Sequence, residues 1–342
     1  MRIGLLYNLA SHAAPLPHDA PGDALYELDG ELSVAAYREA LRSLGHEVAM
    51  VPADGELLTR LRALDVDLCF NTCEGTQGDS REAQVPALLE MLGIPYTGSR
   101  VLALALTLDK PMTKRVLAFH GVRTPMFQEF HAVDEAIDPR LRWPLFAKPA
   151  REGTGMGIGE RSIVRDEAEL RARVEYLLAA YRQPVLVEEY IAGGDVTVGL
   201  LGNWPDIEVL PMSRIDYSGY GERAVPVYGS SYKVDRASEY RCECPARLPA
   251  ALEAELKRLA IETMRVTRTL DFARVDFRLE AATGDTPYVL EINSLPGITP
   301  TSDMAIMTTA AGRPYSALVG GVLAAALARL GLPRPQPLAA VG

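Results

Sequence analysis

Short apolar runs along the chain alternate with segments in which apolar residues recur at helical spacing. In residues 33–44, Val34, Tyr37 and Leu41 recur in this way ahead of Gly45, which predicts a helix that ends there. Further helices are predicted at residues 57–64 and 86–93. Strands are predicted at residues 2–7, 47–51, 66–71 and 94–98. Because strands and helices alternate, residues 1–100 are expected to form an open, mostly parallel sheet of the α/β class.

Beyond residue 100 the same two patterns predict a second set of elements. Strands are predicted at residues 143–149, 160–164, 185–190 and 196–201. Helices are predicted at residues 109–120, 166–181, 251–270 and 316–330. Residues 215–241 are rich in Gly and Tyr and show no regular pattern. A loop of that length is usually functional or mobile.

Residues 272–293 are expected to form a hairpin. Polar and apolar residues alternate through residues 272–279 and again through 288–293, and the segment between them is rich in turn-forming residues. In the second strand, Leu290 and Ile292 are expected on the face opposite Glu291. A turn centred between Thr283 and Gly284 pairs Asp276 with Glu291 and Arg274 with Asn293.

A cation is expected between Asp276 and Glu291, because like charges directly opposite each other destabilise a sheet. Mg²⁺ fits this position better than Zn²⁺, since the candidate ligands are oxygen atoms and neither Cys nor His is near in sequence. An exposed hairpin with scattered charges is the alternative that the residues leave open.

Composition narrows the class of protein. The chain has 342 residues, which indicates two or three domains. Its formal net charge of −10 argues against electrostatic binding of nucleic acid. Residues 316–330 are too short for a membrane span, and the N-terminus lacks the pattern of a signal peptide. A cytoplasmic protein is therefore expected, with reduced thiols favoured over a zinc site at Cys69, Cys73, Cys242 and Cys244.

Two glycine-containing loops are candidate binding segments. REGTGMGIG, at residues 151–159, joins two predicted strands and fits a glycine-rich hairpin over nucleotide phosphates, because glycine lets backbone N–H groups approach an anion. A flexible turn without a ligand is the alternative. Lys110 and Lys148 precede this loop and are candidate phosphate ligands, although Lys110 can also be an ordinary surface residue. CEGTQGDS, at residues 73–80, follows a predicted strand and is a candidate substrate loop or a plain surface loop.

Six motifs connect these features to a known family. In chain order they are IPYTGS at residues 94–99, LDKPMTK at 108–114, FAKPAREGTGMGI at 146–158, VLVEEYIAGGDVTV at 185–198, ARVDFRLE at 273–280 and LEINSLPGITPTS at 290–302. With these motifs in this order, the chain resembles the D-alanine–D-alanine ligases of the ATP-grasp superfamily. The resemblance covers about residues 69–318.

The resemblance implies a three-lobed ATP-grasp fold, α/β in its first domain and α+β in the others, with small-molecule substrates and a homodimeric assembly. The implied domains are an amino-terminal substrate domain at residues 1–106, a central subdomain with the glycine-rich loop at 107–184, a carboxy-terminal subdomain with a mobile loop and the metal site at 185–332, and a flexible tail at 333–342.

The resemblance also implies site residues. Those for ATP are Lys110, Lys148, Gly153, Thr154, Gly155, Glu188, Glu189, Tyr190, Ile191, Asp195 and Lys233. Those for two Mg²⁺ ions, or Mn²⁺, are Asp276, Glu291 and Asn293. The implied catalytic residues are Arg274, Gly297 and Lys233. The implied substrate residues are Thr154, Arg274, Gly297, Ser302 and Asp29, with Glu31 as the alternative to Asp29.

The implied reaction is formation of an amide or peptide bond. ATP would phosphorylate a carboxylate to an acyl phosphate, and an amine would then attack it. The half of the chain that handles substrate departs from the family. The Gly-Gly-x-Ser-x-Glu segment after the first strand is replaced by YNLASHAAPLPHD, and the family's Gly-Ser-Ser becomes Gly153-Thr154-Gly155. We therefore expect a ligase for other amino-acid-like substrates. The alternatives are an authentic D-alanine–D-alanine ligase and a nucleotide-binding regulatory protein without catalysis.

Overall fold

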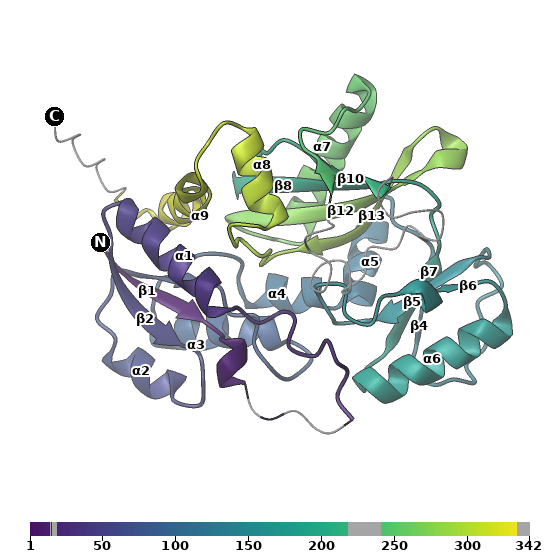
Figure 1. Cartoon of the computed structure of the whole chain (residues 1–342), viewed down its shortest axis with the longest axis horizontal. Coiled ribbons are helices and arrows are strands. Elements are labelled where there is room, and N and C mark those ends of the chain that lie inside the picture. The colour runs from purple at the N-terminus through teal and green to yellow at the C-terminus, as the bar shows by residue number, and fades with distance from the viewer. Residues whose placement is uncertain (14, 16–18, 218–240, 334–342) are drawn as a thin grey trace.

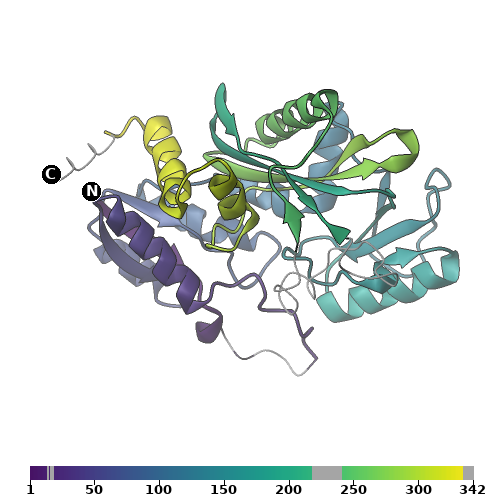
Figure 2. The same cartoon turned by 45° about the horizontal axis from the view of Figure 1, so that its top comes forward.

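The computed structural model describes residues 1–13, 15, 19–217 and 241–333, which form three sheets arranged in three lobes (Figures 1 and 2). The sheet nearest the N-terminus has the strand order β2-β1-β3, and its strands are parallel. These strands are β1 (Arg2–Tyr7), β2 (Glu47–Pro52) and β3 (Leu68–Asn71). The open parallel sheet expected for this part of the chain is confirmed.

Helices pack against this sheet and lead out of it. They are α1 (Glu31–Ser43), α2 (Leu57–Ala63), α3 (Gln84–Leu92) and α4 (Val101–Leu108). Nothing in the hydrophobic pattern predicts α4, because a run as short and apolar as VLALALTL reads equally well as a buried strand. Residues 94–98, expected as a strand, form only a single bridge between Cys69 and Tyr96.

The central lobe is an antiparallel sheet in the order β4-β7-β5-β6. Its elements are α5 (Lys110–Phe119), β4 (Phe127–Phe130), β5 (Leu145–Pro149), β6 (Ile163–Val164), α6 (Glu167–Tyr181) and β7 (Val185–Glu189). Of the strand expected at residues 160–164, only β6 pairs, because Glu160–Ser162 form a 3₁₀ turn. The predicted domain boundary after residue 184 assigns β7 to the third domain, whereas β7 pairs here. The boundary after residue 106 falls inside α4.

The third sheet has the order β11-β10-β8-β12-β13, and β9 pairs with β8. Its strands are β8 (Asp195–Asn203), β9 (Asp206–Val209), β10 (Ser213–Ile215), β11 (Cys242–Glu243), β12 (Phe272–Glu280) and β13 (Thr286–Asn293). The helices around it are α7 (Ala250–Val266), α8 (Asp303–Ala310) and α9 (Tyr315–Leu330).

The predicted hairpin of β12 and β13 is confirmed, and so is its register at the candidate metal ligands. Asp276 pairs with Glu291, and Arg274 pairs with Asn293. The register shifts after Asp276, so that Phe277 pairs with Val289 and Leu290 is the extra residue of a β-bulge. Leu290 therefore lines the same cavity as Glu291, whereas strict alternation placed it on the opposite face.

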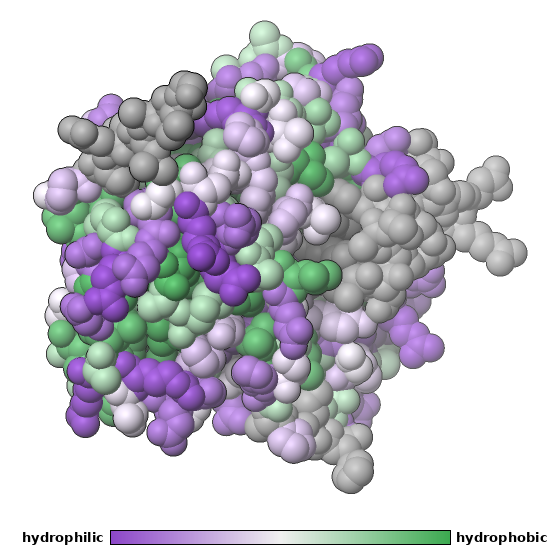
Figure 3. Space-filling model, turned by 60° about the vertical axis from the view of Figure 1, so that its left-hand side comes forward, coloured by the Kyte–Doolittle hydropathy of each residue, from purple (hydrophilic) through white to green (hydrophobic). Residues whose placement is uncertain are grey.

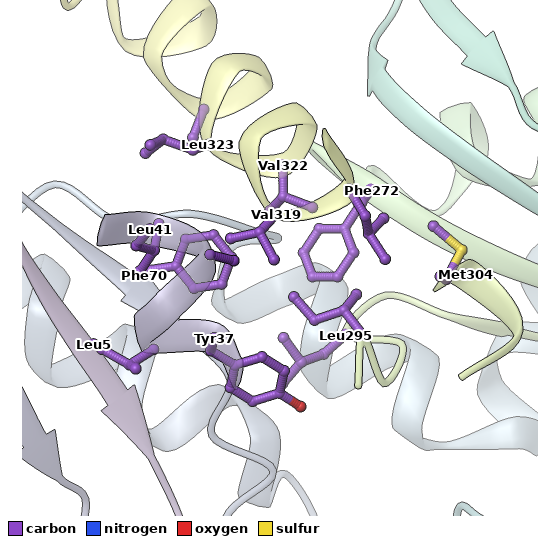
Figure 4. Close-up of a cluster of buried hydrophobic side chains, with 14 of the residues drawn as sticks. Leu5, Tyr37, Leu41, Phe70, Phe272, Leu295, Met304, Val319, Val322 and Leu323 are labelled. Atoms are coloured by element: carbon purple, nitrogen blue, oxygen red, sulfur yellow. The ribbon is translucent and has the colours of Figure 1, made fainter. Parts of the chain in front are cut away.

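One hydrophobic core joins the N-terminal lobe to the third lobe. Figure 4 shows side chains of β1, α1 and β3, such as Leu5, Leu41 and Phe70, next to Phe272 of β12 and Val319 of α9. The central lobe has a separate core between α6 and its own sheet. The first and third lobes are thus packed as one unit, and the cavities described below lie where the central lobe meets them.

The surface mixes polar and apolar side chains, and the cysteines form no disulfide bond. Hydrophilic side chains lie between hydrophobic ones across the face shown in Figure 3. The four cysteines are free. None of the helices in the described part of the chain is both long and apolar enough to cross a membrane.

Candidate active site

Two cavities open between the lobes, and together they contain every predicted site residue that the structure describes. The first, of about 980 Å³, lies between the central sheet and the third sheet. Predicted residues in its wall are Lys110, Lys148, Gly155, Glu188, Glu189, Tyr190, Ile191, Asp195, Arg274, Asp276 and Glu291. The second, of about 1990 Å³, borders the N-terminal lobe. Predicted residues in its wall are Asp29, Lys110, Gly153, Thr154, Arg274, Glu291, Asn293, Gly297 and Ser302. Lys233 lies outside the described residues.

The two cavities meet at four charged side chains. Lys110, Arg274, Glu291 and Asp303 line both of them. The Lys110 ammonium is 3.6 Å from the Glu291 carboxylate, and an Arg274 guanidinium nitrogen is 3.9 Å from the Asp303 carboxylate. A ligand in the first cavity and a ligand in the second would therefore approach each other beside two cations.

Glu188 lies within the first cavity as the centre of a buried ion triplet. Its two carboxylate oxygens are 2.7 Å from the Lys114 ammonium and 2.9 Å from the Lys148 ammonium. The three side chains are at most 5% exposed. Burial lowers the pKa of Lys114, whereas for Lys148 the charges of Glu188 and Glu291 outweigh burial and raise its pKa. The sequence did not reveal Lys114, although its place in LDKPMTK offered a signal.

Glu189, the next residue on β7, turns to the outside of the sheet. Its carboxylate accepts hydrogen bonds from the Arg142 side chain, at 2.7 and 2.9 Å, and from the Arg142 backbone N–H. Arg142 is 74% exposed. Adjacent residues of a strand face opposite sides, so the Glu188 side chain meets two buried lysines while the buried Glu189 side chain meets an exposed arginine.

Arg278 organises the end of the first cavity that holds Tyr190, Ile191 and Asp195, three of the residues implied for ATP. Its guanidinium is 2.6 Å from the Asp195 carboxylate and donates to the Tyr190 hydroxyl at 2.9 Å and the Ile191 carbonyl at 2.8 Å. Arg278, which was not predicted as a site residue, thus holds three predicted residues in place. The alternation of residues 272–279 placed Arg278 on the same face as Asp276, and that was the available signal.

The candidate metal ligands lie on neighbouring positions of β12 and β13, and two of them are hydrogen-bonded to each other. The Asp276 carboxylate accepts from Arg274 at 2.9 Å, from Thr197 at 3.0 Å and from the Asn293 amide at 3.1 Å. Glu291 is opposite Asp276 in the sheet. Within the described residues no group of three or more His, Cys, Asp or Glu side chains is placed to hold a metal. Two carboxylates and an amide are nevertheless the oxygen donors that Mg²⁺ accepts, with phosphate oxygens completing the set.

The glycine-rich loop is covered by acidic side chains of the N-terminal lobe. The backbone N–H of Gly153 donates to the Glu27 carboxylate, and that of Gly157 donates to Asp23 at 3.0 Å. A Cβ atom on residue 153 would lie 2.3 Å from a Glu27 oxygen, so a side chain there would displace the end of the Glu27 side chain. Arg81 joins the group by pairing with Glu27 at 2.6 Å and Glu152 at 3.0 Å. These contacts link segments more than 50 residues apart, and no local pattern indicates them.

Asp29 lies in the wall of the second cavity, as expected for a substrate residue. It accepts hydrogen bonds from the Tyr37 hydroxyl at 2.9 Å and the Thr72 hydroxyl at 3.2 Å. Burial raises the pKa of Asp29 to about 6, against the lowering effect of these two hydrogen bonds. Glu31, the alternative, is exposed in the first turn of α1 and does not line the cavity.

Ser302 also lines the second cavity, but its hydroxyl has a structural partner at each end. The hydroxyl donates to the Thr299 carbonyl at 2.8 Å and accepts from the Ala305 N–H at 3.3 Å, which makes it the N-cap of α8. The predicted contact of Ser302 with a substrate carboxylate would therefore be made from the positive end of a helix.

The motifs and the fold now have counterparts among known proteins. A family described as D-ala D-ala ligase C-terminus matches residues 114–324. The chain belongs to the D-alanine–D-alanine ligase family. It is 37% identical over 296 residues to a D-alanine–D-alanine ligase of Syntrophotalea carbinolica, covering 86% of this chain and 90% of that protein. An uncharacterized protein of Sinorhizobium fredii, y4sG, is 37% identical over 292 residues, or 83% of this chain and 84% of y4sG.

The solved structures confirm the ATP-grasp fold. A D-alanine–D-alanine ligase from Bacillus anthracis, complexed with ATP, superposes with a TM-score of 0.73 at 23% identity, covering 96% of this chain and 98% of that one. Family and fold together make the chain an ATP-grasp enzyme that forms C–N bonds, with ATP and Mg²⁺ as the cofactors typical of such ligases. The alternative of a regulatory protein without catalysis is therefore not favoured.

Proposed function

We propose that this protein is an ATP-dependent carboxylate–amine ligase that works through an acyl phosphate and joins amino-acid-like substrates other than two D-alanines. The observation that supports it is the meeting of the two cavities at Lys110, Arg274, Glu291 and Asp303. In-line phosphoryl transfer needs the γ-phosphate and the accepting carboxylate side by side, with positive charge around both. The junction supports this proposal because both cavities reach it and two cations, Lys110 and Arg274, line it.

Each role in the proposed reaction follows from charge. ATP would occupy the first cavity with its phosphates beside Lys110 and Lys148, and these lysines would offset the negative charge that the carboxylate and the phosphate bring together. Asp276, Glu291 and Asn293 would hold two Mg²⁺ ions, which neutralise phosphate charge and orient the transferred group. Lys233 would add a further cation to the phosphates from its loop.

The second step is attack of the amine on the acyl phosphate, which releases phosphate. Arg274, 14% exposed at the junction, would stabilise the oxyanion of the tetrahedral intermediate together with the Gly297 N–H. Walls from all three lobes would keep water away from the acyl phosphate, which water otherwise hydrolyses. Thr154, Ser302 and Asp29 are proposed to position the substrates in the second cavity.

The substrate assignment rests on what surrounds the second cavity. Its N-terminal side holds the carboxyl groups of Glu27, Asp29, Glu74 and Glu82 beside a few apolar or aromatic side chains such as Leu28. A methyl side chain, as in alanine, gains little from such a wall. The D-alanine–D-alanine ligases among the relatives make the D-alanine pair the competing assignment.

The test is phosphate release from ATP and Mg²⁺ with a matrix of D- and L-amino acids, followed by mass spectrometry of each positive reaction. The Asp276→Asn variant serves as the blank for contaminating phosphatase. A condensed product from a pair other than D-alanine supports the proposal. D-Ala–D-Ala as the preferred product would restore the family's usual substrate, and hydrolysis of ATP without any condensed product would refute ligase chemistry.

A further inference from the structure

The N-terminal wall of the second cavity holds four carboxyl groups, and two of them have no hydrogen-bond or ion-pair partner among the described residues. Glu27, Asp29, Glu74 and Glu82 all line it. Glu27 is paired with Arg81 at 2.6 Å, and Asp29 accepts hydrogen bonds from two neutral hydroxyl groups. The side chains of Glu74 and Glu82 form neither an ion pair nor a hydrogen bond with any residue that the structure describes.

The carboxylates destabilise one another's ionised forms. Burial, with the charge of Glu27 adding to it, raises the pKa of Glu82 to about 8. Burial also raises the pKa of Glu74, and Glu82, Glu27 and Asp29 add to the effect. The charge of Arg81 acts against this rise at both glutamates, and that of Lys110 acts against it at Glu82, but burial and the carboxylates outweigh them. One substrate ammonium beside Asp29 would leave Glu74 and Glu82 without an ion-pair partner. A second cation would relieve their repulsion.

A separate observation fits a polar ligand at this wall. Asn71, at the end of β3, lines the same cavity and is only 2% exposed. Its side-chain oxygen accepts from the Cys73 N–H at 3.2 Å. Its side-chain NH₂ donates to no other residue among those described, so this donor is available to a ligand in the cavity. An aliphatic substrate would leave both Asn71 and the two glutamates unsatisfied.

The opposite end of the cavity determines how such a substrate lies. The carboxylate to be phosphorylated must reach Lys110 and Arg274, where the two cavities meet. The remainder of the same molecule then extends across the cavity toward Asp29, Glu74 and Glu82. The acyl donor is thus the substrate that faces the acidic wall.

We infer that the acyl donor is a basic amino acid, with its α-ammonium at Asp29 and a second cationic nitrogen held by Glu74 and Glu82. This inference rests on the proposed ligase function and deepens it by naming a substrate class. An ionic hydrogen bond at a buried site is worth roughly tenfold or more in affinity. Basic amino acids are therefore expected to bind at least about tenfold more tightly than neutral amino acids of the same length.

The experiment measures binding apart from turnover. Isothermal titration of the full chain, loaded with Mg²⁺ and a non-hydrolysable ATP analogue, compares lysine with norleucine and ornithine with norvaline, each as D and L forms. Glu74→Gln and Glu82→Gln remove one charge each and keep the side-chain shape. Because they relieve repulsion, both variants should fold at least as stably as the wild type. Asp79→Asn, in the same loop but exposed and paired with Arg151, is the matched control.

Each outcome decides the inference. A preference of about tenfold for the basic member, retained in Asp79→Asn and reduced at least threefold in each Gln variant, supports it. Binding should also release protons at pH 7, which appears as a binding enthalpy that depends on the buffer. Equal affinity for both members, a preference that survives in the Gln variants, or binding of neither member would overturn it. Turnover with a neutral pair would uphold the ligase and reject only the substrate class.

Discussion

Replacing Glu188 by Gln should destabilise the protein far more than the same change at Glu189. Glu188 is 3% exposed and lies within 3 Å of two ammonium groups that are themselves at most 5% exposed. Attraction at 2.8 Å amounts to about 6 kcal/mol for each pair at an effective dielectric constant of about 20. Glutamine keeps the shape of the side chain and removes this attraction, so Lys114 and Lys148 repel each other at a buried site.

The destabilisation caused by Glu188→Gln has an upper limit, because one of the two lysines can lose its proton and so remove the repulsion. Neutralising a lysine at pH 7 costs about 5 kcal/mol for an ordinary pKa of about 10.4. Burial has already lowered the pKa of Lys114, so the cost is smaller there. Loss of one partner of a buried pair typically costs about 3–5 kcal/mol, which agrees with this ceiling. We therefore expect a loss of about 3 kcal/mol or more in the free energy of unfolding.

Urea unfolding at pH 7 and pH 9 measures both parts of this reasoning. In Glu188→Gln the unfolded state binds more protons than the folded state, because the buried lysine has the lower pKa. Stability of the variant should therefore rise with pH relative to the wild type. Glu189→Gln, which loses only the contact with exposed Arg142, should lie close to the wild type at both values of pH. The reasoning is refuted if Glu188→Gln is as stable as Glu189→Gln, or if its loss of unfolding free energy relative to the wild type is the same at pH 7 and pH 9.

Further predictions concern a candidate metal ligand, the substrate residue Asp29, a buried ion pair and the oligomeric state. Asp276→Asn should lower Mg²⁺-dependent ADP formation at least about 100-fold with an unchanged circular dichroism spectrum. As pH falls through about 6, Asp29 becomes protonated, so KM for the acyl donor should rise in the wild type and stay flat in Asp29→Asn. Asp271→Asn should cost about 3–5 kcal/mol in urea, because fully buried Asp271 pairs with Arg329 at 2.8 Å, whereas Arg313→Met, at an exposed pair, should not. Light scattering at micromolar concentration should give the mass of a homodimer.

The pairing of Asp276 with Glu291 could be predicted because it depends on local information. Two alternating strands separated by a short turn have few possible registers, and the buried face selects among them. The β-bulge at Leu290 could not be predicted in the same way, because one extra residue in a strand leaves the alternating pattern of the sequence almost unchanged. Motif positions likewise predicted which residues line the cavities. They did not predict that Glu188 would bind two lysines or that Arg278 would hold Asp195 and Tyr190.

Contacts between the N-terminal lobe and the glycine-rich loop could not be predicted from the sequence. They bear on the departures of this chain from the family pattern. The altered segment after β1 and the Gly153-Thr154-Gly155 sequence lie more than 100 residues apart, so they count as two independent changes in the sequence. In the structure Glu27 accepts the Gly153 N–H, and a side chain at residue 153 would collide with it. Asp23 makes the same kind of contact with Gly157. Asp23 and Glu27 follow the replaced segment, and Gly153 is common to the family's Gly-Ser-Ser and to this chain. These contacts therefore bring the neighbourhoods of the two departures together on one surface, although the replaced positions Thr154 and Gly155 do not make them. An exchange of either segment with a D-alanine–D-alanine ligase has to preserve this contact between lobes.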